Sequence, residues 1–242
     1  MNMKRIIAAV VCLIGFSFAG FAQKSSPRVP RKPVKNTLTD AEKETRFVRD
    51  LMKKMTLTEK IGQLSQYVGG ELLTGPKSGA VSDSLFVRGM VGSILNVGGV
   101  DNLRKLQQKN MESSRLKIPI LFAFDVIHGY KTIFPTPLAE SCSWDLALMY
   151  ETAKAAAIEA SASGIHWTFA PMVDVARDPR WGRIVEGAGE DTYLGCKIAE
   201  ARVRGFQWNL GKPNALFACA KHFVAYGAPQ AGRDYAPVDL SL

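Results

Sequence analysis

The 242-residue chain contains only 4 cysteines and 3 histidines, and this scarcity limits the kinds of site it can form. Cys12 lies within the apolar N-terminal run, which leaves three cysteines for the mature chain. Three cysteines do not make the disulfide framework of a small secreted domain, so we interpret them as small apolar side chains. The histidines lack a His-x-x-x-His spacing. The sequence therefore predicts neither a disulfide framework nor a metal site.

The chain also lacks a hydrophobic run of the length that spans a membrane, which is about 20 residues. A shorter apolar run at residues 6–18 follows Lys4 and Arg5 and precedes the small residues at 19–22. This pattern is typical of a secretory signal peptide, here predicted at residues 1–22 with cleavage after Ala22. A lipoprotein anchor is the rival interpretation, but Cys12 lies inside the apolar run rather than after it. We expect export to the periplasm and no stable membrane insertion after cleavage, with secretion and uncleaved membrane tethering as the minor alternatives.

A cluster of basic side chains interleaved with aromatics is a third missing feature, although the net charge is +9. Nucleic-acid binding would need such a cluster on one element, so we expect no nucleic-acid partner. Several basic residues lie instead at residues 23–37, together with Pro27, Pro30 and Pro33. This composition predicts a linker between the signal peptide and a folded domain at residues 38–242.

Apolar runs and amphipathic stretches alternate within the predicted domain. Two helices are expected first, at residues 39–55 and 57–64, because apolar residues recur there at helical spacing. Strands are then predicted at residues 91–97, 118–126, 166–175 and 216–224, separated by helices at 101–115, 145–163 and 191–209. Strands that alternate with helices form a parallel sheet, and continuous apolar strands indicate that both faces are covered.

Polar residues follow several different strands, which distinguishes a barrel from an open sheet. Asp125 and His128 follow the second strand, a charged stretch at 177–183 follows the third, and Lys221 lies in the fourth. A β/α barrel assembles its site in this way, at the C-terminal ends of its strands. The glycine-rich turn of a nucleotide fold is only weakly represented by residues 97–101, so no cofactor is expected. With about half of eight strands, the sequence predicts an α/β fold, an incomplete (β/α)8 TIM-like barrel, N-terminal part only.

Asp125 and Lys221 are the strongest site candidates, because each interrupts an apolar strand where a charge must be paired or have a task. A structural salt bridge is the alternative for Asp125, and a Schiff-base lyase is a further alternative for Lys221. Arg183 can hold a ligand with its planar fork. Two other arginines compete with Arg183 for this role, and Asp178 is expected to neutralise one of them.

The histidines divide into two groups. His222 adjoins Lys221 and is a binding candidate, while His128 is equally compatible with a ligand contact and a structural hydrogen bond. His166 begins its strand at the end opposite the predicted site, which favours a structural role.

These motifs together resemble the N-terminal domain of family 3 glycoside hydrolases, and the bacterial periplasmic β-glucosidase branch in particular. The resemblance covers residues 38–242. The matching motifs are FDVIHG at 124–129, FAP at 169–171, DPRWGR at 178–183, ED at 190–191, KHF at 221–223 and GRDY at 232–235.

The resemblance implies a retaining, exo-acting β-glucosidase that releases terminal non-reducing β-D-glucose from a β-glucoside or oligosaccharide. It implies that the sugar hydroxyls are held by Asp125, Arg183, Lys221 and His222, with His128 and Asp234 as further candidates. The nucleophile and the acid/base of that family are expected beyond Leu242, in the C-terminal remainder of a longer parent enzyme. No residue of this chain is therefore assigned a catalytic role, and the chain alone is expected to be inactive.

Two alternatives stay open within the resemblance. The loop at residues 224–234 contains no histidine, which disfavours the N-acetylglucosaminidase branch but leaves a β-xylosidase. The other alternative is a catalytically incomplete fragment that acts at most as a sugar-binding module. Such a fragment is expected to be poorly stable, because an unfinished barrel exposes a strand edge.

Overall fold

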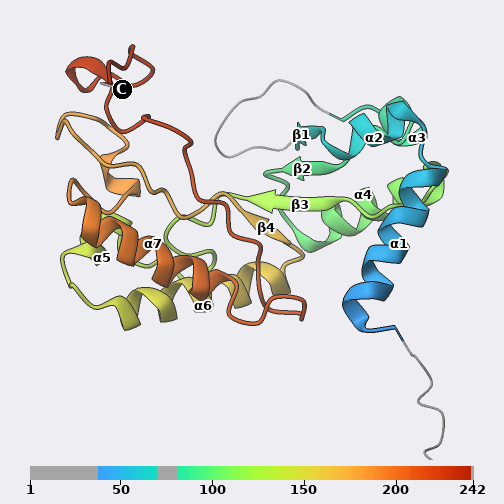
Figure 1. Cartoon of the computed structure of the whole chain (residues 1–242), viewed down its shortest axis with the longest axis horizontal. Helices are drawn as coiled ribbons and strands as arrows, with labels where there is room; N and C mark the ends of the chain where they lie inside the picture. The colour runs from blue at the N-terminus through green and yellow to red at the C-terminus, as the bar shows by residue number, and fades with distance from the viewer. Residues whose placement is uncertain (1–37, 70–80, 241–242) are drawn as a thin grey trace, which may run out of the picture. The chain divides into compact units, whose positions relative to one another are not determined.

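The computed structural model of the chain describes residues 38–69 and 81–240 (Figure 1). The predicted signal peptide and linker at residues 1–37 lie outside the described residues. The chain divides into two compact units, Met1–Phe47 and Val48–Leu242, and the sheet and the candidate site belong to the second. No helix in the described part of the chain has both the length and the apolarity of a bilayer span.

Four parallel strands form the sheet, and they lie side by side in the order in which they occur in the sequence (Figure 1). They are β1 (Gln66–Val68), β2 (Ser93–Leu95), β3 (Leu121–Phe124) and β4 (Trp167–Thr168). In a doubly wound sheet the strand order would reverse at a switch point. Here every connection moves one strand further in the same direction, as in a β/α barrel. The prediction of an α/β fold containing the N-terminal part of a TIM-like barrel is confirmed.

The strands differ from the prediction in number and length. β1 was not predicted, while β2 and β3 lie inside the predicted ranges but are shorter. The predicted strand at 166–175 is reduced to the two residues of β4, and residues 216–224 form no regular strand, so these two predictions are wrong in extent.

The missing strand is nevertheless aligned with its neighbour. Residues 216–224 run parallel to residues 166–173 and make isolated bridges from Phe217 to Trp167 and from Lys221 to Met172. The amide of Lys221 donates to the carbonyl of Pro171 at 3.0 Å. Pro171 itself has no N–H to donate, so the ladder cannot continue regularly through it.

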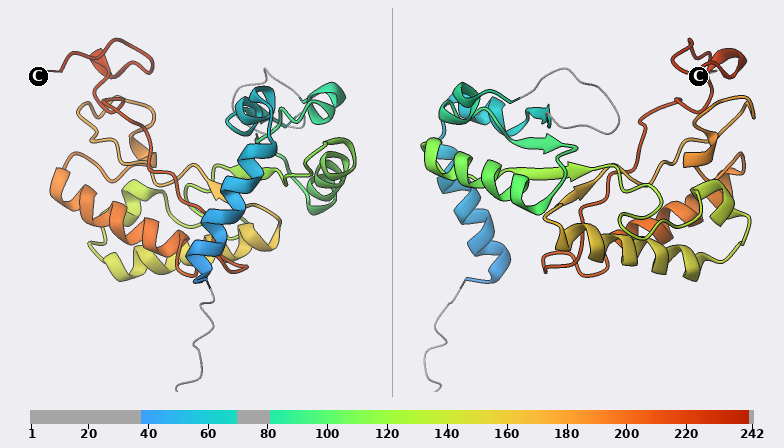
Figure 2. Two further views of the ribbon diagram at one scale, coloured as in Figure 1. Left: turned by 45° about the vertical axis from the view of Figure 1, so that its right-hand side comes forward. Right: turned by 180° about the vertical axis from the view of Figure 1, so that it is seen from behind.

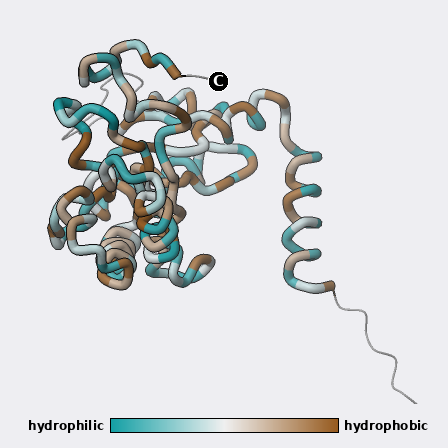
Figure 3. The backbone as a smooth tube through the Cα atoms, turned by 60° about the vertical axis from the view of Figure 1, so that its left-hand side comes forward, coloured by the Kyte–Doolittle hydropathy of each residue, from teal (hydrophilic) through white to brown (hydrophobic). Residues whose placement is uncertain are grey.

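The predicted helices are present. α1 (Asp40–Lys54) follows a capping box, in which the amide of Thr39 donates to Glu42 at 2.8 Å and the amide of Glu42 donates to the Thr39 hydroxyl at 3.3 Å. Apolar positions recur along α1 as brown bands in Figure 3, although none of its residues is buried. The other predicted helices are α2 (Leu57–Gln63), α4 (Val100–Ser113), α6 (Leu146–Ala162) and α7 (Thr192–Phe206).

Several short helices were not predicted. They are α3 (Asp83–Val87), α5 (Pro137–Ser141) and two 3₁₀ turns at Ile184–Glu186 and Gln230–Gly232. Each is five residues or fewer. Such segments are too short to show an apolar period, which explains why the sequence pattern misses them.

Helices α6 and α7 pack side by side against the core (Figures 1 and 2). The alanine-rich face of α6 contributes Ala157 and Ala160, both 0% exposed, to a cluster with Phe122 and Phe206. A Cβ at Gly205 of α7 would lie 2.4 Å from the carbonyl oxygen of Tyr150 in α6. Glycine at this position therefore allows the two helices to approach closely.

Candidate active-site pocket

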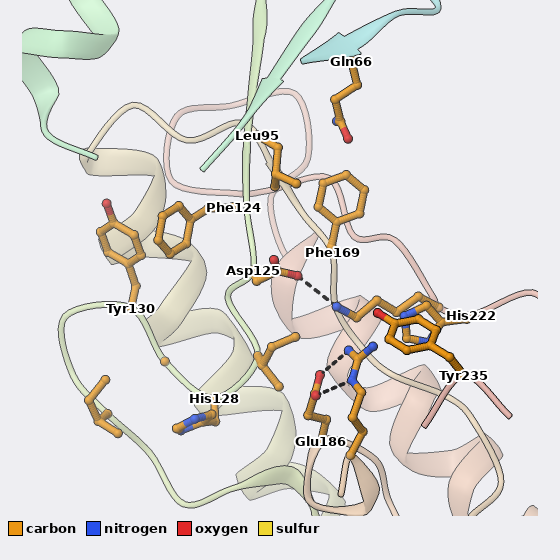
Figure 4. Close-up of a pocket in the computed structure, with 15 residues that line it drawn as sticks. Gln66, Leu95, Phe124, Asp125, His128, Tyr130, Phe169, Glu186, His222 and Tyr235 are labelled. Carbon is orange, nitrogen blue, oxygen red and sulfur yellow. Dashed lines mark hydrogen bonds and ion pairs between the residues drawn. The ribbon is translucent and has the colours of Figure 1, made fainter. Parts of the chain in front are cut away.

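A pocket of about 810 Å³ opens where the strands end (Figure 4). Leu95 and Phe124 close β2 and β3, Phe169 follows β4, and all three line the pocket. Its acidic, basic and histidine lining residues are Asp125, His128, Arg183, Glu186, Lys221 and His222. Five of the six predicted site residues therefore line one pocket, and they come from segments that are far apart in the sequence.

Asp125 and Lys221 both line this pocket and are bonded to one another although they lie 96 positions apart in the chain; a dashed line at Asp125 marks the bond in Figure 4. The ammonium Nζ of Lys221 donates to Oδ1 of Asp125 at 2.9 Å. The Lys221 side chain is 13% exposed and that of Asp125 is 39% exposed. Lys221 therefore has the partner that a buried ammonium requires, and one carboxylate oxygen of Asp125 remains outside this bond.

Arg183 is held by a bidentate ion pair with Glu186 (Figure 4). Nε and Nη2 of Arg183 donate to the two carboxylate oxygens at 2.6 and 2.7 Å, because the short 3₁₀ turn at Ile184–Glu186 brings the two residues together. The hydrogen bonds from Arg183 raise its own pKa above the usual value. Burial raises the pKa of Glu186, but the bonds and charge of Arg183, with Lys221 and His222, outweigh burial and lower it overall.

His222 is oriented by Asp174, a carboxylate whose side chain is 1% exposed. Oδ2 of Asp174 accepts from both the main-chain N–H and Nδ1 of His222, each at 2.9 Å. A carboxylate oxygen can only accept here, so Nδ1 carries the hydrogen and Nε2 is left for other contacts. Asp174 therefore sets the tautomer of a pocket histidine.

His128 lies in a tight loop that is closed by main-chain bonds. Its Nδ1 donates to the carbonyl of Phe134 at 2.9 Å, and the amide of Phe134 donates to the carbonyl of His128 at 2.8 Å. Gly129 has φ +110°, and a Cβ there would lie 1.9 Å from the carbonyl oxygen of Thr132. His128 therefore makes a structural hydrogen bond and also lines the pocket, so both of its predicted roles stay open.

Asp234 does not line the pocket but supports its wall. Oδ1 of Asp234 accepts from Nε1 of Trp181 at 2.9 Å and from the Tyr226 hydroxyl at 2.7 Å. These bonds, that of Trp181 first, lower the pKa of Asp234. Tyr226 in turn lies 3.4 Å from Nη1 of Arg183, so Asp234 contacts the pocket through Tyr226. Burial, with the bond to Asp234, raises the pKa of Tyr226 to about 12 against the opposing effect of Arg183.

The structure also places the residues that were predicted to lie outside the site. Nδ1 of His166 accepts from the amide of Phe122 at 3.1 Å, and burial lowers the pKa of this histidine. Asp178 pairs with Arg180, with bonds of 3.0 and 2.6 Å to its two carboxylate oxygens, as expected for neutralisation of one competing arginine.

Three supporting residues were not predicted, namely Asp174, Glu186 and Tyr226. The spacing of three between Arg183 and Glu186 is the signal that could have revealed their pair, since it places the two residues on one turn. Asp174 is 48 positions away from His222 in the sequence, and Tyr226 is 43 positions away from Arg183, so no local pattern reveals these contacts.

The charges of the pocket compensate one another. Its lining contains two carboxylates, Asp125 and Glu186, and two cations, Arg183 and Lys221. These four charges cancel, yet the lining retains several donors and acceptors. Aromatic side chains, including Phe124, Phe169 and Tyr235, supply apolar surface beside these polar groups (Figure 4). This combination suits a neutral ligand that has many hydroxyl groups.

Comparison with known proteins identifies similar domains and enzymes. Residues 56–241 match the model described as Glycosyl hydrolase family 3 N terminal domain. The chain is 44% identical over 199 residues to the periplasmic beta-glucosidase of Salmonella typhimurium, covering 81% of this chain and 25% of that protein. It is 30% identical over 214 residues to a putative beta-xylosidase of Formosa agariphila, covering 79% of this chain and 28% of that protein.

A solved structure is also similar to this fold. The beta-glucosidase of Listeria innocua in complex with glucose matches with a TM-score of 0.72 at 37% identity. The match covers 81% of this chain and 29% of the Listeria chain. The chain therefore spans about a quarter of the length of the proteins it resembles.

Proposed function

This chain belongs to the glycosyl hydrolase family 3 N-terminal domain family, and we propose that its pocket holds the terminal sugar of a β-glucoside. In this proposal the chain is part of a retaining, exo-acting β-glucosidase. The observation that carries it is the convergence of Asp125, Arg183, Lys221 and His222 on one pocket.

The four side chains have complementary hydrogen-bonding capacities. Asp125 can accept from two sugar hydroxyls, since one of its oxygens is outside the bond to Lys221. Lys221 uses one of three N–H donors on Asp125, and His222 keeps Nε2. Charge-assisted bonds of this kind hold a neutral polyol ring firmly and fix the position of its anomeric carbon. His128 and Asp234 are assigned lesser roles, His128 at the pocket wall and Asp234 behind Tyr226.

The bond-breaking groups are assigned to polypeptide outside these 242 residues. Retaining glycosidases need a nucleophile and an acid/base about 5 to 5.5 Å apart. Asp125 and Glu186, the carboxylates that line the pocket, are each bonded to a cation. The proposed division of labour is that this chain binds and orients the sugar, while further polypeptide supplies the two carboxyl groups.

The proposal extends to location and organisation. Residues 1–22 are proposed as a signal peptide, 23–37 as a linker and 38–242 as part of the barrel domain. The name of the Salmonella relative, a periplasmic enzyme, supports export to the periplasm. No cofactor and no nucleic acid enter the proposed reaction.

Replacement of Asp125 tests the proposal directly. Asp125→Ala should weaken glucose binding by roughly 30- to 1,000-fold, because a charged acceptor for two hydroxyls is lost and Lys221 is left unpaired. Isothermal titration of the full chain with glucose and with gluconolactone measures this loss. In a longer enzyme that contains the chain, turnover of an aryl β-glucoside should fall by a similar factor.

Asp101→Ala is the matched control, since Asp101 pairs with Arg104 on the exposed surface of α4. Equal affinities of the wild type and Asp125→Ala would remove Asp125 from the sugar site. A wild-type chain that melts cooperatively but binds neither sugar would contradict the proposed pocket.

A β-xylosidase is the second candidate, favoured by the similarity to the putative beta-xylosidase of Formosa agariphila. Xylose lacks the hydroxymethyl group that glucose carries on C5, so the two sugars probe one part of the pocket. A higher kcat/KM on an aryl β-xyloside than on the β-glucoside would decide for this candidate.

A further inference from the structure

Arg202 and Glu140 form a buried ion pair outside the pocket. Arg202 lies in α7 and Glu140 in α5, and Nη1 of Arg202 donates to Oε2 of Glu140 at 2.6 Å. Both side chains are 4% exposed. Neither residue lines the pocket, and neither belongs to the motifs that identify the family.

This pair is poorly explained as a stabilising contact. Removing two charges from water costs about as much as their attraction returns unless every remaining polar atom is also bonded. Here Oε1 of Glu140 and Nε of Arg202 are buried without a hydrogen-bond partner among the described residues. Two apolar side chains would fill the same space without that cost, so the charged pair points to another role.

Arg202 makes a further bond, through Nη2 of its guanidinium group, to the backbone of the pocket. Nη2 donates to the main-chain carbonyl of Ile127. Ile127 lies two positions after Asp125 and one before His128, and all three line the pocket. The planar fork of Arg202 thus connects a carboxylate on α5 with the backbone of the pocket segment.

We propose that Arg202 and Glu140 are positioning residues, which fix the pocket segment at residues 125–134 by holding the carbonyl of Ile127. Glu140 orients the guanidinium, and the guanidinium holds the backbone between Asp125 and His128. The effect on sugar affinity rests on the proposed function, whereas the effect on the segment does not.

Other contacts show that this segment is anchored at several points. The amide of Val126 donates to the buried hydroxyl of Thr168 at 3.1 Å. The amides of Lys131 and Thr132 donate to Glu159 of α6 at 2.9 and 2.8 Å. Arg202 supplies the anchor between these two, at the point where the chain turns from β3 into the loop.

The double variant Arg202→Met/Glu140→Leu tests this role. It replaces the buried charges with apolar side chains of similar size, so the thermal midpoint of the full chain should stay unchanged or rise. Hydrogen exchange should accelerate roughly tenfold at the amides of Lys131, Thr132 and Phe134, because the carbonyl of Ile127 has lost its donor. The amide of Leu121, bonded to Gly92 at 3.1 Å in the sheet, should keep its protection.

The matched control is Arg204→Met/Glu200→Leu, which removes an exposed pair from the same helix. This control should leave exchange at residues 131–134 unchanged. Unchanged exchange at those amides in the Arg202→Met/Glu140→Leu variant would overturn the proposal. Acceleration of equal size throughout the sheet would overturn it too, because the pair would then stabilise the whole domain rather than one segment.

Two further measurements keep the test decisive. If the double variant does not fold, Arg202→Lys retains the charge but cannot bridge two acceptors in a fork. It should accelerate exchange at the same three amides, and unchanged exchange would count against the proposal. Glucose affinity of the double variant should fall roughly tenfold. If the wild type binds no glucose, the proposed function fails while the exchange result still decides the positioning role.

Discussion

Replacing Glu186 by glutamine tests whether the pocket is electrically balanced for an uncharged ligand. Glu186 accepts from Nε and Nη2 of Arg183 at 2.6 and 2.7 Å. Glutamine keeps the size and one acceptor oxygen but removes the charge. One N–H of Arg183 then loses its acceptor, and the pocket lining carries one uncompensated positive charge.

The size of the expected loss of glucose affinity follows from the burial of the Arg183–Glu186 ion pair. A hydrogen bond to a charged group contributes about 1.5–3 kcal/mol, whereas an exposed ion pair contributes about 0.2–1 kcal/mol. Arg183 and Glu186 are each 26% exposed, which places their interaction between these limits, at about 1–2 kcal/mol. In Glu186→Gln the Arg183 side chain is held less firmly, so a ligand that bonds to it must fix it in position on binding, at the cost of part of the binding free energy. Glucose affinity should therefore fall roughly 5- to 30-fold in Glu186→Gln.

Isothermal titration of the full chain with glucose at pH 7 measures the effect. Glu190→Gln removes the same charge from an exposed position four residues further along and is the matched control. An affinity of Glu186→Gln within twofold of the wild type would refute the reasoning. An equal loss in both variants would also refute it, since the effect would then be general electrostatics rather than the fixing of Arg183.

The pH dependence gives an independent check. The folded-state pKa of Glu186 lies below its usual 4.5, so its charge contributes fully above that value. The contribution is lost as the pH falls through the lower folded pKa. The difference between the wild type and Glu186→Gln should stay constant from about pH 7 to 5 and shrink only below about 4.5. A difference that already shrinks between about pH 7 and 6 would contradict the assignment to this carboxyl group.

Two further predictions concern stability. Gly129→Ala should destabilise the domain by roughly 1–3 kcal/mol in urea unfolding, because its φ is +110° and the new methyl group would meet a main-chain oxygen at 1.9 Å. Gly98→Ala, where no atom lies within 4 Å of the new Cβ, is its control, and equal losses in both would contradict the prediction. Glu59→Gln should lower the melting temperature at pH 6 and flatten its decline in acid. Hydrogen bonds, that of Arg115 first, lower the pKa of Glu59 from 4.5 to about 2, so its stabilisation is present above 4.5 and lost as the pH falls toward 2. Parallel acid profiles for the wild type and Glu59→Gln would contradict it.

Much of the fold could be predicted because its signals are local. The capping box at Thr39 and the helical period behind it concern neighbouring residues, and α1 begins where they indicate. The strands were harder to predict from the sequence, since a strand is defined by its partner as well as by its own residues. Residues 166–175 have a suitable apolar pattern, but Pro171 withholds a donor and only Trp167–Thr168 remain regular.

The two strongest site candidates in the sequence are those whose surroundings make a charge costly. Asp125 and Lys221 each stand in an apolar run, and burial of either alone would be unfavourable. That cost predicts a partner without identifying it, and the structure shows that each is the partner of the other. The same argument fails for Tyr226, because an uncharged tyrosine in a loop carries no such cost and its contact with Arg183 depends on the fold.

Each cation in the pocket is matched to a carboxylate before any ligand arrives, as Lys221 is to Asp125 and Arg183 is to Glu186. If the proposed function holds, a bound sugar would add hydrogen bonds to groups that are already held in place, and it would not have to neutralise a charge. A phosphate or carboxylate ligand would instead bring a further negative charge beside Asp125 and Glu186, which already neutralise the two cations. We therefore expect the pocket to discriminate against anions through its internal ion pairs, and Glu186→Gln to relax that discrimination as it weakens the proposed binding of a neutral sugar.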